Sequence, residues 1–136
     1  MLDLHIAATL FMTGVIWFVQ LTHYPLFGDV GEDSFRRYHA EHTRRTTWVV
    51  FPPMAIELVT AILLVVKDPT MLRLVGLGLV LLIWGSTAGL QVPDHQRLAK
   101  GLDVSIVRRL VMTNWLRTVA WSVRSAICLY WMYLYR

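Results

Sequence analysis

Four long runs of mainly apolar residues alternate with polar stretches along this chain of 136 residues. The runs cover residues 4–27, 47–66, 71–92 and 110–135. A helix needs about 20 mostly apolar residues to cross the hydrocarbon core of a bilayer, and each run is long enough. The pattern therefore predicts an all-α fold, a four-helix bundle that forms a single transmembrane domain over residues 1–136.

Composition favours the membrane over water. Hydrophobic residues make up 56% of the chain and charged residues 16%, against about 25% charged in an average soluble domain. A soluble protein this small could not bury so much apolar surface. The net charge of +4 does not indicate a nucleic-acid partner, because the cations stand between the apolar runs. There they act as topology signals and as partners of lipid headgroups.

The distribution of cations predicts the orientation. Four spans place both termini on one side, here side A, and the polar stretches 28–45 and 94–109 on side B. Side B carries eight cations and side A three, so the positive-inside rule places side B in the cytoplasm and both termini outside. The side-B cations are Arg36, Arg37, Arg44, Arg45, Arg97, Lys100, Arg108 and Arg109, and those of side A are Lys67, Arg73 and Arg136.

The second helix should extend beyond the membrane on the cytoplasmic side. Asp33 or Ser34 is a suitable N-cap, and no helix breaker follows before the apolar run. Pro52 and Pro53 then predict a kink inside the membrane.

Two charges at equal depth predict an ion pair inside the bundle. Glu57 precedes Lys67 by ten residues and Arg124 precedes Tyr135 by eleven, so both lie about 15 Å from side A at ~1.5 Å per residue. Charges in hydrocarbon normally face the bundle and find partners. The pair either fixes helix register or serves proton transfer or substrate anchoring.

Polar residues on all four predicted helices recur at helical spacing. On the fourth helix they share one face with Trp121 and Cys128, and the set is Asn114, Arg117, Trp121, Arg124 and Cys128. The other helices offer Thr13, Gln20 and His23, then His39, His42 and Glu57, then Thr87, Gln91 and, if the third helix passes Pro93, His95. We therefore expect a polar cavity that opens toward side B.

Four of the five histidines, His23, His39, His42 and His95, fall near side B. Imidazole is the commonest metal ligand, so these residues are candidate ligands of zinc, iron or copper, with Asp94 or Glu41 as spare carboxylates. The alternative is a set of histidines at headgroup level that bind loops. Glu57 is fifteen residues beyond His42, about 22 Å along a helix, and cannot share their metal.

Two resemblances extend these expectations. The segments Leu4-His5-Ile6, Ile16-Trp17-Phe18 and Tyr24-Pro25-Leu26-Phe27, followed by a proline-bearing second helix, resemble the four-helix membrane protoporphyrinogen oxidases of bacterial haem synthesis. That resemblance implies a haem ligand at His5 and a bacterial inner membrane. The family's lysine in the third helix is missing here, and Arg73 is the nearest cation. Residues 113–118 are similar to the last helix of small anthrone-oxygenase-like membrane proteins.

Three functions fit the sequence. One is an oxidoreductase or metalloenzyme for a lipophilic small molecule, with the histidines on the metal, Arg117 and Asn114 on an anionic or carbonyl group, and Glu57 and Arg124 at the cavity floor. The second is a ligand-binding or transport module, which for transport would need a homo-oligomer. The third is a structural subunit of a membrane complex, associating through the small residues of the third helix.

Overall fold

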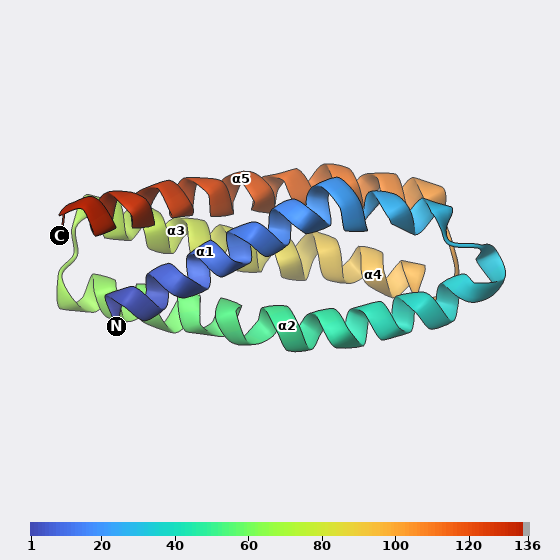
Figure 1. Ribbon diagram of the computed structural model, residues 1–136, viewed down its shortest axis with the longest axis horizontal. Coiled ribbons are helices and arrows are strands. Elements are labelled where there is room, and N and C mark those ends of the chain that lie inside the picture. The colour runs from blue at the N-terminus through green and yellow to red at the C-terminus, as the bar shows by residue number, and fades with distance from the viewer. Residues whose placement is uncertain (135–136) are drawn as a thin grey trace.

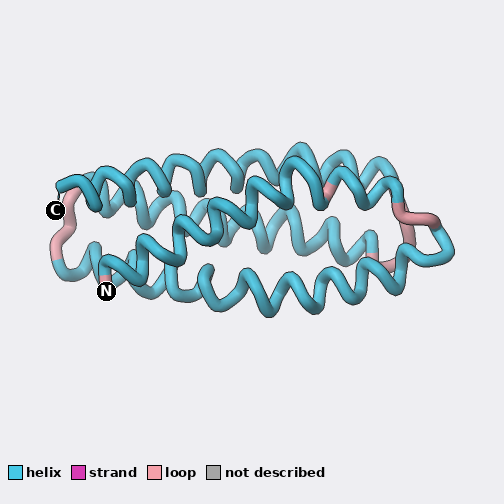
Figure 2. Tube along the Cα trace, viewed as in Figure 1, coloured by secondary structure: helices cyan, strands magenta, loops and turns pink. Residues whose placement is uncertain are grey.

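The computed structural model describes residues 1–134, which form a four-helix bundle with no strand (Figures 1 and 2). This confirms the predicted fold class. Both chain ends lie at the same end of the bundle (Figure 1). In chain order the elements are α1 (Leu2–Phe18), η1 (Val19–His23), η2 (Pro25–Asp29), α2 (Glu32–Lys67), α3 (Met71–Ser86), η3 (Thr87–Gln91), α4 (Val92–Leu98) and α5 (Val104–Leu134). Tyr135 and Arg136, at the end of the predicted fourth span, lie outside the described residues.

The elements α3, η3 and α4 follow one another without a break and form the third of four helical rods in the bundle. This rod is longer than the predicted span 71–92. A π-helical turn, η3, joins α3 to α4, and the rod passes Pro93 and ends at Leu98. Pro93 stands in the first turn of α4, a position at which proline is tolerated because its missing N–H is an orphan donor anyway. The polar stretch 94–109 is therefore mostly helical and brings His95 onto the rod.

The second rod, α2, is a single helix of 36 residues that contains both Pro52 and Pro53. It extends on side B as predicted, but it begins at Glu32 after Gly31, slightly ahead of the expected caps Asp33 and Ser34. No side chain caps this end. Glu32 and Asp33 instead occupy the first turn, where their negative charges complement the helix dipole.

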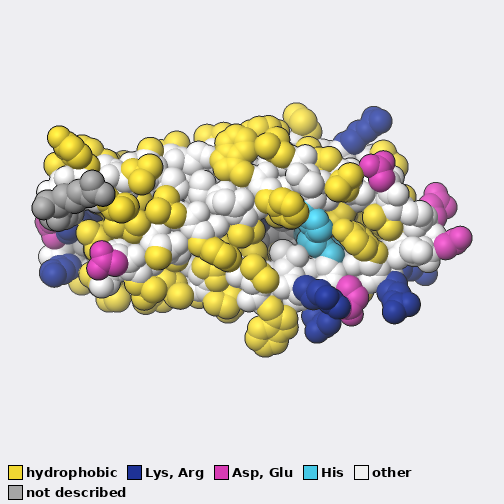
Figure 3. Space-filling model, viewed as in Figure 1, with side chains coloured by type: hydrophobic (Ala, Val, Ile, Leu, Met, Phe, Trp, Pro, Cys, Tyr) yellow, Lys and Arg dark blue, Asp and Glu magenta, His cyan; other side chains and the backbone are white. Residues whose placement is uncertain are grey.

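Three of the four rods are long and apolar enough to cross a membrane: Leu2–Asp29, Glu32–Lys67 and Met71–Leu98. The fourth, α5, lies alongside them over the length of the bundle (Figure 1). It is less apolar because its buried face carries Asn114, Arg117 and Arg124. On the face in Figure 3, charged side chains gather at both ends and apolar side chains cover the middle.

Short connections close both ends of the bundle. On side A, the Arg73 guanidinium reaches the Asp68 carboxylate at 2.7 Å and so fastens the turn between α2 and α3. On side B, Gly101 adopts a φ of 150°, which favours glycine, before α5 begins. The Asp103 carboxylate accepts hydrogen bonds from the Ser105 hydroxyl and from the Ile106 backbone N–H, and these hold the pKa of Asp103 below its ordinary value.

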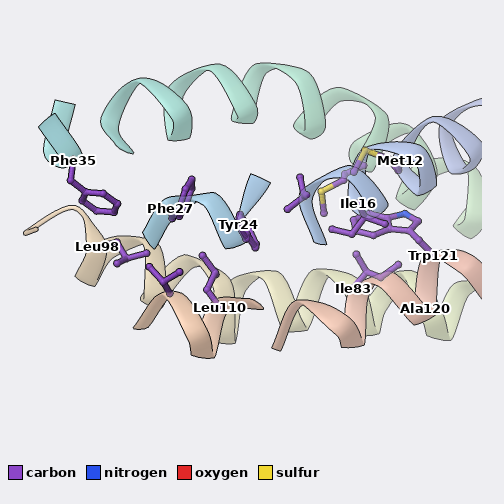
Figure 4. Close-up of a cluster of buried hydrophobic side chains, with 13 residues drawn as sticks. Met12, Ile16, Tyr24, Phe27, Phe35, Ile83, Leu98, Leu110, Ala120 and Trp121 are labelled. Carbon is purple, nitrogen blue, oxygen red and sulfur yellow. The ribbon is translucent and has the colours of Figure 1, made fainter. Parts of the chain in front are cut away.

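Aromatic and aliphatic side chains from every rod fill the side-B half of the bundle (Figure 4). Phe27, Phe35 and Leu98 are fully buried there, and Trp121 marks the far limit of this core. A smaller cluster around Ile6, Cys128 and Trp131 fills the side-A end. Buried polar groups also occur in two layers of the bundle: an upper layer near side B around the histidines and Arg117, and a lower layer around Glu57 and Arg124. The upper layer is the candidate site.

Candidate functional site

The four side-B histidines meet in one cluster. His23 Nε2 lies 2.6 Å from His42 Nδ1, and His39 Nε2 lies 2.9 Å from His95 Nδ1. The two pairs adjoin, since the rings of His42 and His95 are 5.6 Å apart between centroids. They come from η1, α2 and α4, so the histidines contact one another across the bundle instead of binding to loops.

Tyr24 connects this cluster to Arg117 and was not among the predicted site residues. Its hydroxyl lies 3.1 Å from His95 Nε2 and accepts a hydrogen bond from Arg117 Nη2 at 3.4 Å. If the hydroxyl donates to His95 Nε2, then His95 Nδ1 can donate to His39 Nε2, and all donors and acceptors are matched. A sequence signal existed, because Tyr24 follows Gln20 by four residues on the polar face of the first helix.

Phe27, also missed by the sequence, supports the histidine cluster from one side. Its ring packs edge-on against all four imidazoles, at 4.9 Å from His42 and 5.3 Å from His23 between centroids. Two π-helical turns flank the cluster: η1 ends at His23, and η3 ends at Gln91, four residues before His95. Such turns add a residue to the helix and occur frequently at functional sites.

Arg117 is buried beside the cluster and is held by neutral groups. Its Nε donates to Asn114 Oδ1 at 3.0 Å and its Nη1 donates to Thr87 Oγ1 at 3.2 Å. Asn114 in turn donates to Gln20 Oε1 at 2.9 Å, and this hydrogen bond connects the Asn114 side chain of α5 to the first rod. The predicted residues Asn114 and Arg117 thus lie together, and Asn114 orients the guanidinium.

A cavity of about 610 Å³ joins the histidines to Arg117. His39, His42 and His95 line one end, Arg117 and Thr87 line one wall, and Trp121 closes the bottom. Apolar side chains supply most of the remaining wall: Met12, Val15, Ile16, Val19, Val50, Met54 and Val92. In Figure 3 a histidine lies in a hollow between apolar side chains. A second groove, of about 690 Å³ between α1 and α2, also reaches His23 and His42.

The predicted ion pair between Glu57 and Arg124 is present, with Arg124 Nη2 at 2.9 Å from Glu57 Oε1. Both side chains are about 2% exposed. Glu57 also accepts hydrogen bonds from the Thr9 hydroxyl at 2.7 Å and from the Trp121 indole N–H at 2.9 Å. Arg124 Nη1 donates to the Gly76 carbonyl at 2.6 Å. The pair therefore connects α1, α2, α3 and α5 in a single layer.

This layer lies below the cavity instead of lining its floor, which corrects the position expected for Glu57 and Arg124. Trp121 lies between the cavity and the layer of Glu57 and Arg124. Its ring lines the cavity, and its indole N–H donates to Glu57. The carboxylate oxygens are already occupied by Arg124, Thr9 and Trp121. The geometry thus favours the register-fixing role of the pair over direct contact with a ligand in the cavity.

His5 belongs to the lower layer and is 2% exposed, so it is not simply solvated. Its Nδ1 lies 2.7 Å from Thr60 Oγ1, and its Nε2 lies 3.4 Å from Arg124 Nη2. Because the Thr60 hydroxyl donates to the Ile56 carbonyl at 2.6 Å, His5 Nδ1 donates to Thr60 and Nε2 accepts from Arg124. Both ring nitrogens are thus engaged by protein groups.

The two spare carboxylates form ion pairs with arginines and make no hydrogen bond to the histidine cluster, although Glu41 lines the second groove together with His23 and His42. Asp94 is fully buried, and its nearest charged partner is Arg109, with Nε at 3.3 Å. Glu41 pairs with Arg44 and Arg45 on the exposed face of α2, at 2.9 and 3.0 Å. Within residues 1–134, no group of three or more His, Cys, Asp or Glu side chains already has the arrangement of a metal site.

Comparison of the chain with models of known families, with curated protein sequences and with solved structures found no match. The two resemblances noted in the sequence therefore stay predictions, and the functional argument depends on the site itself.

The lower layer generates a stability prediction. Glu57→Gln or Arg124→Gln each leaves one buried charge without its partner, and each should destabilise the fold by about 3–5 kcal/mol. The double variant Glu57→Gln/Arg124→Gln should lose less than the sum of the two, because neither charge is then left alone. Thermal unfolding in detergent, followed by circular dichroism, gives the comparison.

Glu41→Gln, on the exposed face of α2, the helix that carries Glu57, is the control and should change the unfolding temperature little. Additive losses in the double variant would contradict the coupling.

Proposed function

We propose that the protein is an integral membrane oxidoreductase with a transition metal at His23, His39, His42 and His95 and a lipophilic substrate in the adjoining cavity. One observation carries the proposal: imidazoles from three separate rods converge at the end of a cavity that also contains a buried arginine. Packing does not require such a convergence, since apolar side chains of similar size would fill the same space without polar groups to satisfy.

The donor set supports a metal. Imidazoles bound to one tetrahedral ion at about 2.0–2.1 Å have ring centroids roughly 5 Å apart. The rings of His39, His42 and His95 are spaced at 5.2, 5.6 and 6.2 Å, and His23 adjoins His42 at 4.5 Å. The spacing of His39, His42 and His95 is thus close to that of imidazoles on one metal, and His23 adjoins the set through His42. An all-imidazole set suits zinc, copper and iron, of which iron or copper would supply redox chemistry when bound.

Neighbouring side chains complete the proposed site. With His95 Nδ1 directed at the metal, the Nε2–H donates to the Tyr24 hydroxyl, the kind of outer hydrogen bond that fixes a ligating imidazole. Arg117, held by Asn114, orients an anionic or carbonyl group of the substrate. Haem at His5 is less favoured, because Thr60 and Arg124 already engage both ring nitrogens.

A second candidate function is a ligand-binding module without bond-making. The observation that favours it is the cavity itself, which combines apolar walls, one cation and a volume in the range of small-molecule sites. The two candidates differ in whether the histidines hold a metal.

Metal content separates the two candidates. The protein purified in detergent should contain iron or copper in stoichiometric amount, measured by inductively coupled plasma mass spectrometry. Zinc alone would support the metal site but contradict the redox chemistry, because Zn²⁺ has none. His39→Ala and His42→Ala should lose most of the metal, and Glu41→Gln, the matched control on the same helix, should keep it. A visible spectrum distinguishes a bare metal from haem by its Soret band. A folded, colourless and metal-free wild-type protein would contradict the metal site and favour the binding module.

We also propose that the bundle spans a bacterial inner membrane with side B in the cytoplasm. The three apolar rods and the cations at the side-B end support this placement. Alkaline phosphatase fused after the C-terminus should be active and green fluorescent protein fused there should be dark. Phosphatase inserted between Lys100 and Leu102 should be inactive. The reverse pattern of activities would show that side B faces outward and would contradict the proposed orientation.

A further inference from the structure

Two buried arginines on the inner face of α5 have different surroundings. Arg124 has the Glu57 carboxylate at 2.9 Å. Arg117, two turns earlier on the same helix, is only 7% exposed and has no carboxylate within ion-pair distance among residues 1–134. An arginine inside a membrane bundle is costly unless an opposite charge or a full set of acceptors surrounds it. Arg117 lacks the opposite charge.

Within residues 1–134, no buried carboxylate supplies that charge. Glu57 and Asp94 are the buried carboxylates of the described chain. Glu57 is paired with Arg124 and Asp94 with Arg109. Arg109 is 44% exposed, and neither Asp94 oxygen has a hydrogen-bond partner among the described residues. Neither buried carboxylate lies within ion-pair distance of Arg117, which lines the cavity.

One donor of Arg117 remains free for a ligand. The guanidinium has five N–H groups. Nε and Nη2 donate to Asn114 Oδ1, Nη2 also donates to the Tyr24 hydroxyl, and Nη1 donates once to Thr87 Oγ1. The second N–H of Nη1 has no partner in the described chain. A single oxygen atom in the cavity would therefore meet a full positive charge and one free donor.

The remainder of the cavity suits an apolar body. Its walls are methionine, valine and isoleucine side chains from α1, α2 and α4, and its volume is about 610 Å³. Apolar pockets with a few placed polar groups are typical of small-molecule sites. A ligand with one charged oxygen and an apolar remainder therefore matches both parts of the cavity.

The cavity opens sideways, between α2 and α4. Its rim includes Ala40, Thr43 and Thr47 on α2, Gln96 on α4, and Ala99, which caps the end of α4; all are exposed at the surface of the bundle. Trp48 and Phe51, which follow the rim on α2, are 75% and 56% exposed. Tryptophan is enriched where headgroups meet hydrocarbon. The opening therefore lies at the boundary where a membrane-dissolved amphiphile has its polar end.

From these contacts we infer that the cavity binds a lipophilic monoanion, a carboxylate or a phenolate, which enters from the bilayer between α2 and α4 and pairs its oxygen with Arg117. This deepens the proposed function by naming its substrate class. The anionic oxygen supplies the negative charge that Arg117 has no partner for in the protein. The apolar remainder of the ligand packs against the apolar lining that includes Met12 and Met54. Tyr24, which contacts both Arg117 and His95, places that oxygen beside the histidine cluster.

The test is ligand-dependent thermal stabilisation of the full chain in phosphatidylcholine nanodiscs. Laurate and pentachlorophenolate are the two anionic probes, and methyl laurate is the neutral match for laurate. A ligand that binds the folded state raises the unfolding temperature with concentration, which gives an apparent Kd. Laurate, pentachlorophenolate or both should stabilise the wild-type protein, and the probe that does so identifies the head group. Methyl laurate should not.

Two arginine variants on α5 locate the binding. Arg117→Gln should weaken binding of the anion by about tenfold or more, because the buried charge is lost. Arg108→Gln removes an exposed cation from the same helix and should leave the apparent Kd unchanged. Ala99→Trp, at the rim, should weaken anion binding without altering Arg117, and it keeps the inference testable if Arg117→Gln does not fold. Equal binding of methyl laurate, undiminished binding by Arg117→Gln, or no binding of either anion overturns the inference.

Metal analysis of the same samples keeps the two proposals separate. Arg117→Gln should retain the wild-type metal content, because Arg117 is not a ligand. Metal without anion-selective binding would leave the proposed oxidoreductase standing and reject the lipophilic monoanion. Anion-selective binding without metal would support the lipophilic monoanion and reject the metal-dependent oxidoreductase.

Discussion

Inside this bundle, every buried charge needs charged or polar partners, because neither hydrocarbon nor apolar side chains can solvate it. The contact between Arg124 and Glu57 meets this requirement for the side-A half, at 2.9 Å and with the Thr9 hydroxyl, the Trp121 indole and the Gly76 carbonyl around it. A shift of any one helix by a turn would separate at least one of these partners. The pair therefore sets the register of all four helices, and the side-B half is built on that register.

Above Trp121 the same requirement is met differently. Arg117 is surrounded by amide and hydroxyl groups, and the imidazoles are hydrogen-bonded to one another and to Tyr24. Four imidazoles this close cannot all carry protons without strong repulsion, so the cluster is suited to remain neutral, the form in which histidine binds metals. In the lower layer Arg124 and Glu57 neutralise each other, and Arg124 Nε alone of the guanidinium nitrogens has no hydrogen-bond partner among the described residues. The upper layer instead offers a cation without a carboxylate partner and a set of imidazoles that could bind something. This contrast is the physical basis for placing function at side B.

Helical periodicity and charge were enough to predict much of this arrangement. Equal distance from side A identified the partner of Glu57, and spacing by three and four residues identified the inner face of α5 from Asn114 to Cys128. The four histidines were grouped by their place near side B. These predictions succeeded because the cost of burying polar groups constrains which face of a helix turns inward.

Other features depend on the backbone path and were not predictable in the same way. The roles of Tyr24 and Phe27 depend on the π-helical turn η1, which changes the phase of the first rod by one residue. Trp121 lines the cavity while its indole N–H donates to Glu57, and neither Glu57 nor Arg124 lines the cavity. His5 is buried where it contacts Thr60, 55 residues away in the sequence. The partners of Asp94 and Asp103 follow from where α4 ends and α5 begins. Proline and polarity placed the end of the third helix too early, at residue 92, and the start of the fourth too late, at residue 110.

X-ray absorption spectroscopy on the metal of the purified protein tests the central claim most directly, because it reports the ligands themselves. The account predicts a first shell of nitrogen at about 2.0–2.1 Å with the multiple-scattering pattern of several imidazoles. Substitution of His42 by alanine should reduce that pattern. A first shell of oxygen or sulfur without imidazole scattering would contradict the assignment of His23, His39, His42 and His95 as the metal site.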